Sequence, residues 1–421
     1  MFGQLFIKEC RQTARSLIYW VVVLILVFNF TSQLGDMEIE KKPEPGQEEY
    51  GIKPSHDPEL IMKTVLGELT EEYYRESYTT YPIGFYKKVT LNEKDDKKIE
   101  EILKEAAGID GRDDAGQLIE DWYTRQQETE EKELRGMYQE PLKVEPADSL
   151  TYERFGELMD VADKILGGGS GYAEEYRENS ASEIMTYEDA AEAYNTLTEK
   201  DRLSGGYARL FSDYMVIFLG ILPVFLAVTR GLRDRRAMMQ ELIYTRRCSS
   251  FTVVTSRYLS MIVMLVIPVL IISLVPLSKC IEYARTAGIS IDMLAFVKYT
   301  FGWLVPTIMI VTAAGMLLTE LTDTAAAVLV QGVWWFITIF GGIGRISGGM
   351  YGWSLAPRHN TEMNWQGFHD GFGQLAANRL FYTAAALLLV FLSVLVYSQK
   401  RKGRFKVRGK ILADRKGKSK E

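Results

Sequence analysis

Long apolar segments constrain the fold of this chain more than any other feature of its sequence. An α-helix rises about 1.5 Å per residue and the hydrocarbon core of a membrane is about 30 Å thick, so a helix needs roughly 20 mostly uncharged residues to cross it. Six segments meet this requirement, and each is predicted to be a transmembrane helix. They are residues 17–34, 210–229, 253–277, 296–318, 325–344 and 379–397. Buried helices of a soluble protein are the alternative, but such helices seldom run so long with so little charge.

Residues 1–16 carry apolar side chains at intervals of three and four, with Lys8, Arg11 and Arg15 between them. This pattern predicts an N-terminal helix that lies in the membrane interface, or else a plain extension of the first span. A basic start before an apolar segment is also typical of a secretory signal peptide, but no pair of small residues suited to cleavage follows it. We therefore expect residues 17–34 to remain as an anchor.

Positive charge is concentrated in three segments. Residues 1–16 contain three basic side chains and one acidic one. Residues 230–252 contain six basic and two acidic side chains, and residues 398–421 contain eleven basic and two acidic side chains. Because basic flanks are retained on the cytoplasmic side, this distribution predicts a multi-pass protein of the plasma membrane with both termini in the cytoplasm and residues 35–206 outside. The basic tail, residues 398–421, either only enforces this topology or also binds acidic lipids.

The segment predicted to lie outside, residues 35–206, is strongly acidic. From Asp36 onward it holds 43 acidic and 21 basic side chains, a net charge of −22. A proline-rich linker over residues 36–58 prevents the first span from continuing into it as a helix. Beyond the linker, apolar periodicity and capping residues such as Asp57 and Thr151 predict a mainly helical domain. The predicted helices are residues 57–78, 93–107, 113–136, a helix that begins at Ser149 or Thr151 and ends at Leu166, and residues 187–203, with one short strand within residues 84–91.

These elements together predict an all-α membrane protein with six transmembrane helices and a mainly helical extracellular domain between spans 1 and 2. The last outer segment, residues 345–378, is rich in glycine and tryptophan, and it either lies on the membrane surface or re-enters the membrane. The three cysteines, Cys10, Cys248 and Cys280, do not have the spacing of a metal site, and no metal is expected.

The segment between the second and third spans, residues 230–252, is the most informative part of the sequence. Within it, residues 233–247 contain good helix formers and neither proline nor glycine. A small apolar face separates the charged side chains, and it consists of Met238, Met239, Leu242 and Ile243. A short amphipathic helix between two spans is suited to docking in a groove of a cytoplasmic partner. The alternative is that this basic loop is only a topology signal.

This segment resembles the permease subunits of ATP-binding-cassette transporters of the type-2 export class. In that family the loop after the second span carries Glu followed by several Leu, then a small residue and Ser, an aromatic residue, and a Gly-Lys pair. The corresponding residues here are Glu241, Leu242, Ile243, Ser249, Phe251 and the pair Ser256 and Arg257. Three residues depart from the pattern: Met238 replaces a usual Gly, Arg247 a usual Pro and Ser256 the Gly. Residues 357–360 (PRHN) and 378–382 (NRLFY) are also similar to the family, so that only the predicted extracellular domain is not covered.

The resemblance implies a transport subunit that is not itself an enzyme and binds no cofactor. A separate cytoplasmic ATP-binding-cassette ATPase would bind the ATP, and a second permease subunit, identical or related, would complete the transporter. The residues expected to couple to the ATPase are Met238, Met239, Glu241, Leu242, Ile243 and Arg246. In agreement, the sequence contains no phosphate-binding G-x-x-x-x-G-K-[ST] motif, and its charge does not favour nucleic acid as a partner. The low charge of the spans favours export of an apolar or amphipathic cargo, such as a peptide, a drug-like or a lipid-like molecule.

Two further features lie near the start of the second span. Residues 203–206 (LSGG) spell most of the signature of a cassette ATPase, but without a phosphate-binding loop they are interpreted as a flexible junction. Arg209 and Asp213 lie one helical turn apart, at the outer edge of the span. Our hypothesis is that these two side chains pair and form an outer gate.

The alternative function is that of a membrane sensor or immunity protein. In that case the acidic external domain would bind a cationic peptide, because its net charge of −22 would attract one. A membrane-embedded enzyme is a third class, and no cluster of His, Ser or carboxylate residues at a span end favours it.

Overall fold

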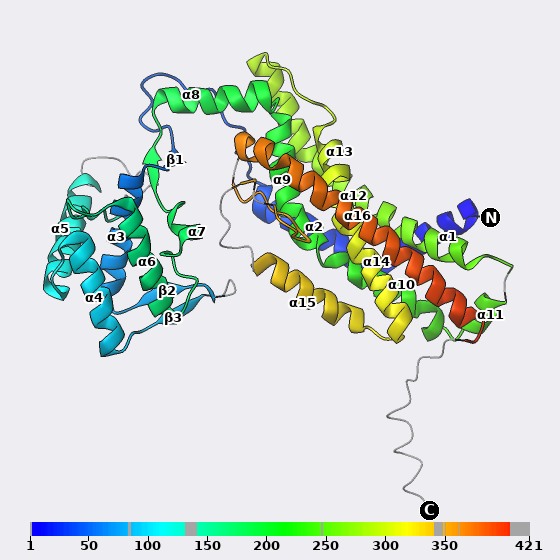
Figure 1. Ribbon diagram of the computed structural model, residues 1–421. Helices are drawn as coiled ribbons and strands as arrows, with labels where there is room; N and C mark the ends of the chain where they lie inside the picture. The colour runs from blue at the N-terminus through cyan, green and yellow to red at the C-terminus, as the bar shows by residue number, and fades with distance from the viewer. Residues whose placement is uncertain are drawn as a thin grey trace, which may run out of the picture. The chain divides into compact units, whose positions relative to one another are not determined.

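The computed structural model describes residues 2–82, 86–130, 141–245, 247–340, 348–349, 351–361 and 363–404, and these are mostly helical (Figure 1). The chain divides into two compact units. We call the first, which comprises Met1–Lys41, Tyr194–Ile339 and Gly348–Glu421, the bundle. The second comprises Lys42–Ala193 together with Phe340–Ser347, and we call it the inserted domain.

The bundle contains all of the long apolar helices. Among the described residues, four helical segments are long and apolar enough to cross a membrane: α2 (Leu17–Leu34), α12 (Ser250–Ala287), the segment Ala295–Thr322, and α16 (Trp365–Arg401). The remaining elements are α1 (Phe2–Ala14), η2 (Thr196–Lys200), α9 (Ser204–Leu219), α10 (Leu222–Arg236), α11 (Gln240–Tyr244) and α15 (Ala326–Phe340). Within Ala295–Thr322, α13 (Ala295–Tyr299) passes through the π-helical turn η3 (Thr300–Leu304) into α14 (Val305–Thr322).

The predicted second span, residues 210–229, is not one continuous helix. It is divided between α9 and α10, which are bent by 42° where they meet. Pro223 stands in the first turn of α10 and has no N–H to continue the backbone ladder. If the bent pair is counted as one span, the described residues contain five candidate spans. Of the predicted fifth span, residues 325–344, the structure describes α15, whose 15 residues cover about 22 Å, and residues 341–344 lie outside the described residues.

Side chains of α15 satisfy the carbonyl groups that the bend leaves free. Gln331, which is buried, donates from Nε2 to the carbonyl oxygen of Gly220 at 2.7 Å. Trp335 donates from Nε1 to the carbonyl oxygen of Ile217, also at 2.7 Å. A buried carbonyl without a partner is costly, so these two bonds stabilise the bend and fix α15 beside it.

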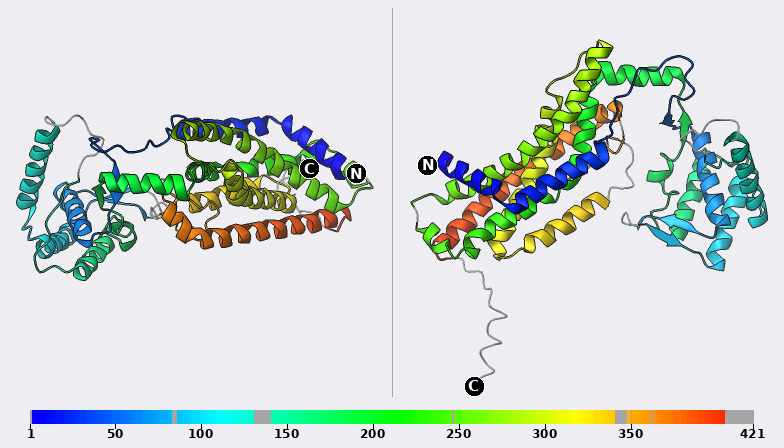
Figure 2. Two further views of the ribbon diagram at one scale, coloured as in Figure 1. Left: turned by 90° about the horizontal axis from the view of Figure 1, so that it is seen from above. Right: turned by 180° about the vertical axis from the view of Figure 1, so that it is seen from behind.

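The centre of the bundle is α14, which packs against α10 and α16 (Figure 1). Its run beside α16 is also visible in both views of Figure 2. The approach of α14 to α10 is close because Gly315 has no side chain. A Cβ atom there would lie only 2.9 Å from Cβ of Ala227 and 3.1 Å from Cγ2 of Val224. Small residues at such contacts let helix backbones approach in a membrane protein.

The segment before the last helix is shorter than predicted. Residues 345–378 are predicted as an outer loop, but α16 already begins at Trp365, where Asn364 caps it by accepting from the Gly367 N–H. The described part of the loop is held by buried hydrogen bonds to neighbouring helices. Arg379 of α16 donates to the carbonyl oxygens of Trp303, Ser354 and Leu355, and Trp303 Nε1 donates to the carbonyl oxygen of Pro357.

The inserted domain is mainly helical but not all-α. Its helices are α3 (Pro58–Tyr74), α4 (Glu93–Ala107), α5 (Arg112–Glu130), α6 (Tyr152–Leu166), α7 (Glu174–Arg177) and most of α8 (Tyr187–Asn195). In the part of this domain that the structure describes, four strands of three residues form two antiparallel pairs. They are β1 (Ile52–Pro54) with β4 (Ser182–Ile184), and β2 (Tyr78–Thr80) with β3 (Lys87–Val89). The predicted helix 187–203 differs, because α8 ends at Asn195 and the π-helical turn η2 follows.

Local capping explains where the helices of this domain begin and end. Asn92 accepts from the N–H groups of Lys94 and Asp95 at the start of α4, and Gly108 ends α4 in the left-handed conformation. Thr151 and Gly167 act in the same way for α6. The apolar faces of these helices enclose one core that includes Leu66, Tyr73, Tyr78, Leu103 and Phe155.

Candidate coupling site at the connection of α10 and α12

The segment between α10 and α12 is not the single amphipathic helix predicted over residues 233–247. Helix α10 continues to Arg236, and Met238 then takes a positive φ of 53°, which ends the helix. The chain resumes as α11, a helix of five residues, before Ser249 caps α12 by accepting from the Thr252 N–H. The prediction failed here because a methionine is expected to continue a helix and rarely adopts the left-handed conformation.

The predicted coupling residues lie on the surface of this connection. Met238 is 89% exposed, Leu242 is 63% exposed and Met239 is 44% exposed. Glu241 is also exposed and Ile243 is half-buried, while Arg246 lies outside the described residues. We call Met238, Met239 and Leu242 the apolar tip. Exposed apolar side chains that lie together are typical of a surface that binds a partner, and methionine adapts readily to such contacts.

The connection is held in place by the far end of α16. Arg401 donates from Nε to the carbonyl oxygen of Tyr244 at 2.7 Å and also hydrogen-bonds the carbonyl oxygen of Cys248. The rings of Tyr244 and Tyr397 pack edge to face with their centroids 5.5 Å apart. A force applied to α11 would therefore reach α16 directly.

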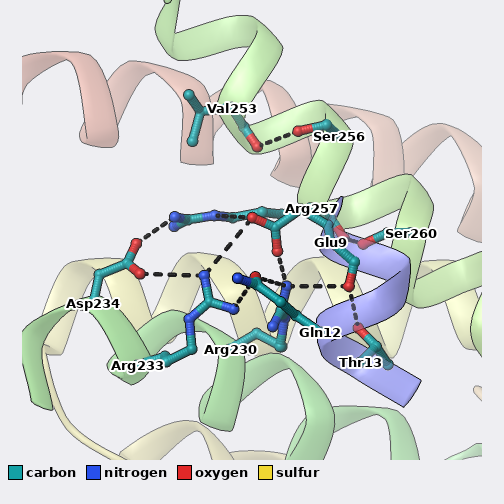
Figure 3. A network of polar contacts seen from close by, with 10 residues as sticks. All are labelled: Glu9, Gln12, Thr13, Arg230, Arg233, Asp234, Val253, Ser256, Arg257 and Ser260. Atoms are coloured by element: carbon teal, nitrogen blue, oxygen red, sulfur yellow. Dashed lines mark hydrogen bonds and ion pairs between the residues drawn. The ribbon is translucent and has the colours of Figure 1, made fainter. Parts of the chain in front are cut away.

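A network of charged side chains joins α1 to α10 and α12, the two helices that flank the connection (Figure 3). Glu9 of α1 forms an ion pair with Arg230 of α10, and its carboxylate also lies 3.8 Å from Arg233 Nη2 and 3.7 Å from Arg257 Nε. Asp234 accepts from Arg257 and lies 3.3 Å from Arg233 Nη2. Gln12 accepts hydrogen bonds from both Arg230 and Arg233. We call Glu9, Gln12, Arg230, Arg233, Asp234 and Arg257 the arginine network.

The arginine network is buried, apart from Gln12 and Arg233, which are half-buried, and it joins three helices. Glu9 is 3% exposed, and Arg230, Asp234 and Arg257 are each less than 10% exposed. Removing one partner from a buried ion pair leaves an uncompensated charge, which typically costs about 3–5 kcal/mol. The two carboxylates therefore hold α1, α10 and α12 together through the three guanidinium groups.

Sequence reasoning did not find the arginine network. Arg257 is part of a motif in which Ser256 and Arg257 replace a Gly-Lys pair, but its partners cannot be read from that motif. One available signal was that Glu9 is the only acidic residue among residues 1–16. It lies four residues before Thr13 on the buried side of α1, and Thr13 donates to its carbonyl oxygen at 3.0 Å.

The predicted outer gate is wrong in its pairing. Arg209 is bound to Asp201, with Nη1 at 3.1 Å from Oδ1 and Nη2 at 2.5 Å from Oδ2. Asp213 instead accepts from Arg358 Nη2 at 2.8 Å and from the backbone N–H of His359. Spacing along α9 could not reveal these partners, because they come from other segments of the bundle. Arg209 and Asp213 nevertheless line the same cavity.

Residues 203–206 prove to be part of the packed structure. Ser204 Oγ lies 2.9 Å from both the carbonyl oxygen and the N–H of Asp292, and Ser204, Gly205 and Gly206 are buried. A structural role at the start of α9 thus accounts for them. Among the described residues, no group of three or more His, Cys, Asp and Glu side chains could hold a metal ion.

Comparison with known proteins identifies the family. The model of the family described as ABC-2 family transporter protein matches residues 149–365, which is just over half of the 421-residue chain. The match includes α9, α10, the apolar tip, α12, α14 and α15. No curated protein and no solved structure matches the chain. The chain therefore belongs to the ABC-2 family of transporter proteins and is a membrane permease.

Proposed function

We propose that this permease exports its cargo with energy from a separate ATP-binding-cassette ATPase, which docks on the apolar tip. The observation that carries the proposal is the exposure of Met238, Met239 and Leu242. The connection that bears them is held to α16 by the hydrogen bond from Arg401 to the carbonyl oxygen of Tyr244. An apolar surface of this kind needs a partner to cover it. Exposed Arg235 and Arg236 lie beside it, so the complementary groove is expected to carry carboxylates at its rim.

The contacts behind the apolar tip suggest how the ATPase would move the bundle. Displacement of α11 would pull on α16 through Arg401, while displacement of α10 would act on α1 and α12 through the arginine network. These helices would then tilt as a unit around α14. Such rigid-body movement could alternate the access of a cargo site between the two sides of the membrane.

The distribution of basic residues supports the remaining features of the proposal. It favours an orientation in the plasma membrane with the apolar tip and both termini in the cytoplasm and the inserted domain outside. A second permease, identical or related, would form the other half of the transporter. The many apolar side chains exposed on α2, α12 and α16 are suited to contact with lipid or with that second subunit. The cargo is expected to be apolar or amphipathic.

Site-specific photocrosslinking tests the docking surface. A photoreactive amino acid would be placed at Met238 or Leu242 in one pair of variants, and at Met293 as the matched control. Met293 is an exposed methionine of the same bundle, between α12 and α13. We expect positions 238 and 242, but not position 293, to crosslink to a protein that mass spectrometry identifies as an ATP-binding-cassette ATPase. Equal crosslinking at all three positions, or none to an ATPase, would refute docking at the apolar tip.

A further inference from the structure

Helix α1 carries three basic side chains along one side. Lys8, Arg11 and Arg15 follow one another at intervals of three and four residues, which places them on one face of a helix. The N–H of Arg15 donates to the carbonyl oxygen of Arg11, so the helical path of α1 extends through Arg15. We call Lys8, Arg11 and Arg15 the basic stripe.

The positive charge of the basic stripe is not compensated by the described part of the chain. All three side chains are exposed, and none of them forms an ion pair or a side-chain hydrogen bond with a residue that the structure describes. Glu9, the one acidic residue among residues 1–16, lies on the buried side of α1 and is bound to Arg230. The three cations are therefore available to a partner outside the chain.

The buried side of α1 fixes the direction in which the basic stripe points. Glu9 and Thr13 are buried against the bundle, where α1 packs against α12. Each residue advances about 100° around a helix, so the middle of the stripe lies about 150° from this buried side. The stripe therefore points away from the bundle, toward the medium that surrounds it at the level of α1.

The junction of α1 with α2 indicates what this medium is. Helix α1 is not a straight extension of α2, because Ser16 between them has an extended backbone with φ −82° and ψ 128°. It turns away from the line of α2 in Figure 1 and in the right view of Figure 2. Trp20, in the first turn of α2, is exposed and donates from Nε1 to the carbonyl oxygen of Ala14 at 2.8 Å. An exposed tryptophan at the end of an apolar helix is typical of the boundary between lipid tails and head groups.

An apolar surface begins directly after the basic stripe. Large apolar side chains of α2 recur at intervals of three and four residues on one side, and each is more than half exposed. They are Leu17, Trp20, Leu24 and Phe28. Helix α2 is long and apolar enough to cross a membrane, so this surface is suited to contact with lipid tails. The basic stripe continues it at the level where the head groups of the same lipids lie.

We infer that the basic stripe binds the anionic head groups of phospholipids in the leaflet beside α1. A head group with a net negative charge, such as that of phosphatidylglycerol, complements three exposed cations that the chain leaves unpaired. Glu9, on the buried side of the same helix, pairs with Arg230, so lipid bound to the stripe would also stabilise the position of α1 in the arginine network. The inference concerns α1 and lipid alone and stands whether or not an ATPase docks at the apolar tip.

Hydrogen exchange of the full-length chain in lipid nanodiscs tests this inference. One set of nanodiscs contains phosphatidylglycerol, and the other contains phosphatidylcholine with the same acyl chains. Each basic residue near an anionic surface strengthens binding about fivefold, so three correspond to about 100-fold. We expect the amides of residues 6–14 to exchange about tenfold more slowly, or slower still, in phosphatidylglycerol. Equal exchange in the two lipids would overturn the inference.

Variants assign the effect to the basic stripe. Replacement of all three of its residues by Gln should abolish the difference between the two lipids, and the exposure of these side chains means that the variant should fold. Lys416→Gln, Lys418→Gln and Lys420→Gln together remove the same charge from the basic tail and should leave the difference at residues 6–14 unchanged. Arg11→Lys with Arg15→Lys should also preserve it, because the attraction depends on charge. A difference that persists in the triple Gln variant of the stripe would overturn the inference.

The alternative partner for the basic stripe is an acidic surface of another protein. A photoreactive amino acid at position 11 of the full-length chain, in membranes that contain phosphatidylglycerol, distinguishes the two. We expect an adduct with phospholipid that mass spectrometry identifies by its head group. An adduct with a protein and none with phospholipid would overturn the inference.

Discussion

Glu9 and Arg230 form a buried ion pair between residues that are 221 positions apart in the sequence. The pair connects α1, a helix that cannot span the membrane, to the end of α10, from which the apolar tip begins. Arg257 and Arg233 lie close to the same carboxylate, so the negative charge of Glu9 compensates part of the positive charge of three guanidinium groups. The position of α1 is thus coupled to that of both helices that flank the connection.

Substitution of Glu9 should be the most damaging change in the arginine network. Glu9→Gln keeps the size of the side chain but leaves Arg230 without its carboxylate, and we expect a loss of stability of about 3–5 kcal/mol. The midpoint of thermal unfolding in detergent measures it. Lys8→Gln, one residue away on the exposed side of α1, is the control and should have no effect. If the two variants unfold at the same temperature, Glu9 does not hold α1 to α10.

Met238 can be tested for strain and for docking with one pair of variants. Met238→Gly removes the cost of the positive φ of 53° and should stabilise the chain by about 1 kcal/mol. It also removes the most exposed side chain of the apolar tip, so crosslinking or co-purification of the ATPase should weaken. Met238→Leu is the control, since it retains an apolar side chain and should preserve docking. Unchanged docking by the glycine variant would show that Met238 is not part of the surface.

The bend between α9 and α10 should depend on Gln331. Gln331→Leu has a similar size but leaves the carbonyl oxygen of Gly220 without its partner, and we expect a loss of about 1–3 kcal/mol. Val333→Ala, at a position of α15 that is 53% exposed, is the control and should change stability little. Hydrogen exchange of the intact protein should show faster exchange near residues 217–224 only in the Gln331 variant. Slow exchange there in both variants would contradict the role of α15.

Capping signals allowed some elements to be predicted closely, because they act between neighbouring residues. The predicted helix 93–107 is α4 with the same bounds, and the helix predicted to be capped by Ser149 or Thr151 and to end at Leu166 is α6, with Thr151 as its cap. Pro223 is a local signal for a break in this span, but the hydrogen bond from Gln331 that stabilises the bend at Gly220 could not be predicted, because Gln331 lies 111 positions later in the sequence. The apolar residues of the tip were predicted from their pattern, but the break at Met238 was not, since its conformation opposes the preference of the residue.

Ion pairs were the least predictable feature of both sites. Arg209 and Asp213 have the spacing of a helical pair, yet each finds a partner that is brought near by folding, namely Asp201 and Arg358. An exposed ion pair between residues four apart on a helix stabilises that helix by only a few tenths of a kcal/mol. Buried partners with better geometry outweigh it. Hence the sequence located the residues of the cavity on α9 without revealing the pairs.

The contact of α10 with α14 provides a test of the packing at the centre of the bundle. Gly315→Ala places a methyl group 2.9 Å from Cβ of Ala227, so the helices must separate, and we expect a loss of about 1–3 kcal/mol. Gly332→Ala on α15 is the matched control, because a Cβ atom there meets nothing within 4 Å. That variant should be neutral or slightly more stable, since alanine favours the helix. Equal effects of the two variants would mean that α10 and α14 are not in close contact.

The inserted domain should respond to pH through Glu68 on α3. Glu68 is exposed as a whole residue, but its carboxyl group lies against Gly171, and the resulting desolvation, followed by the charges of Glu72 and Glu71, raises the pKa of Glu68 to about 7. The unperturbed value is 4.5, so between pH 4.5 and about 7 the folded domain binds more protons than the unfolded chain. Because of this, the contribution of Glu68 to stability is present below pH 4.5 and is lost as the pH rises through 7.

Replacement of Glu68 by glutamine should therefore abolish one component of the pH dependence. Relative to the wild type, Glu68→Gln should become more stable as the pH is raised from 5 to 8, because the variant no longer loses a proton. Hydrogen exchange of the α3 peptides in the intact chain measures this difference. Glu101→Gln, an exposed residue of α4, controls for the general effect of removing a negative charge. If wild type and Glu68→Gln show parallel protection from pH 5 to pH 8, the carboxyl of Glu68 does not titrate in this range.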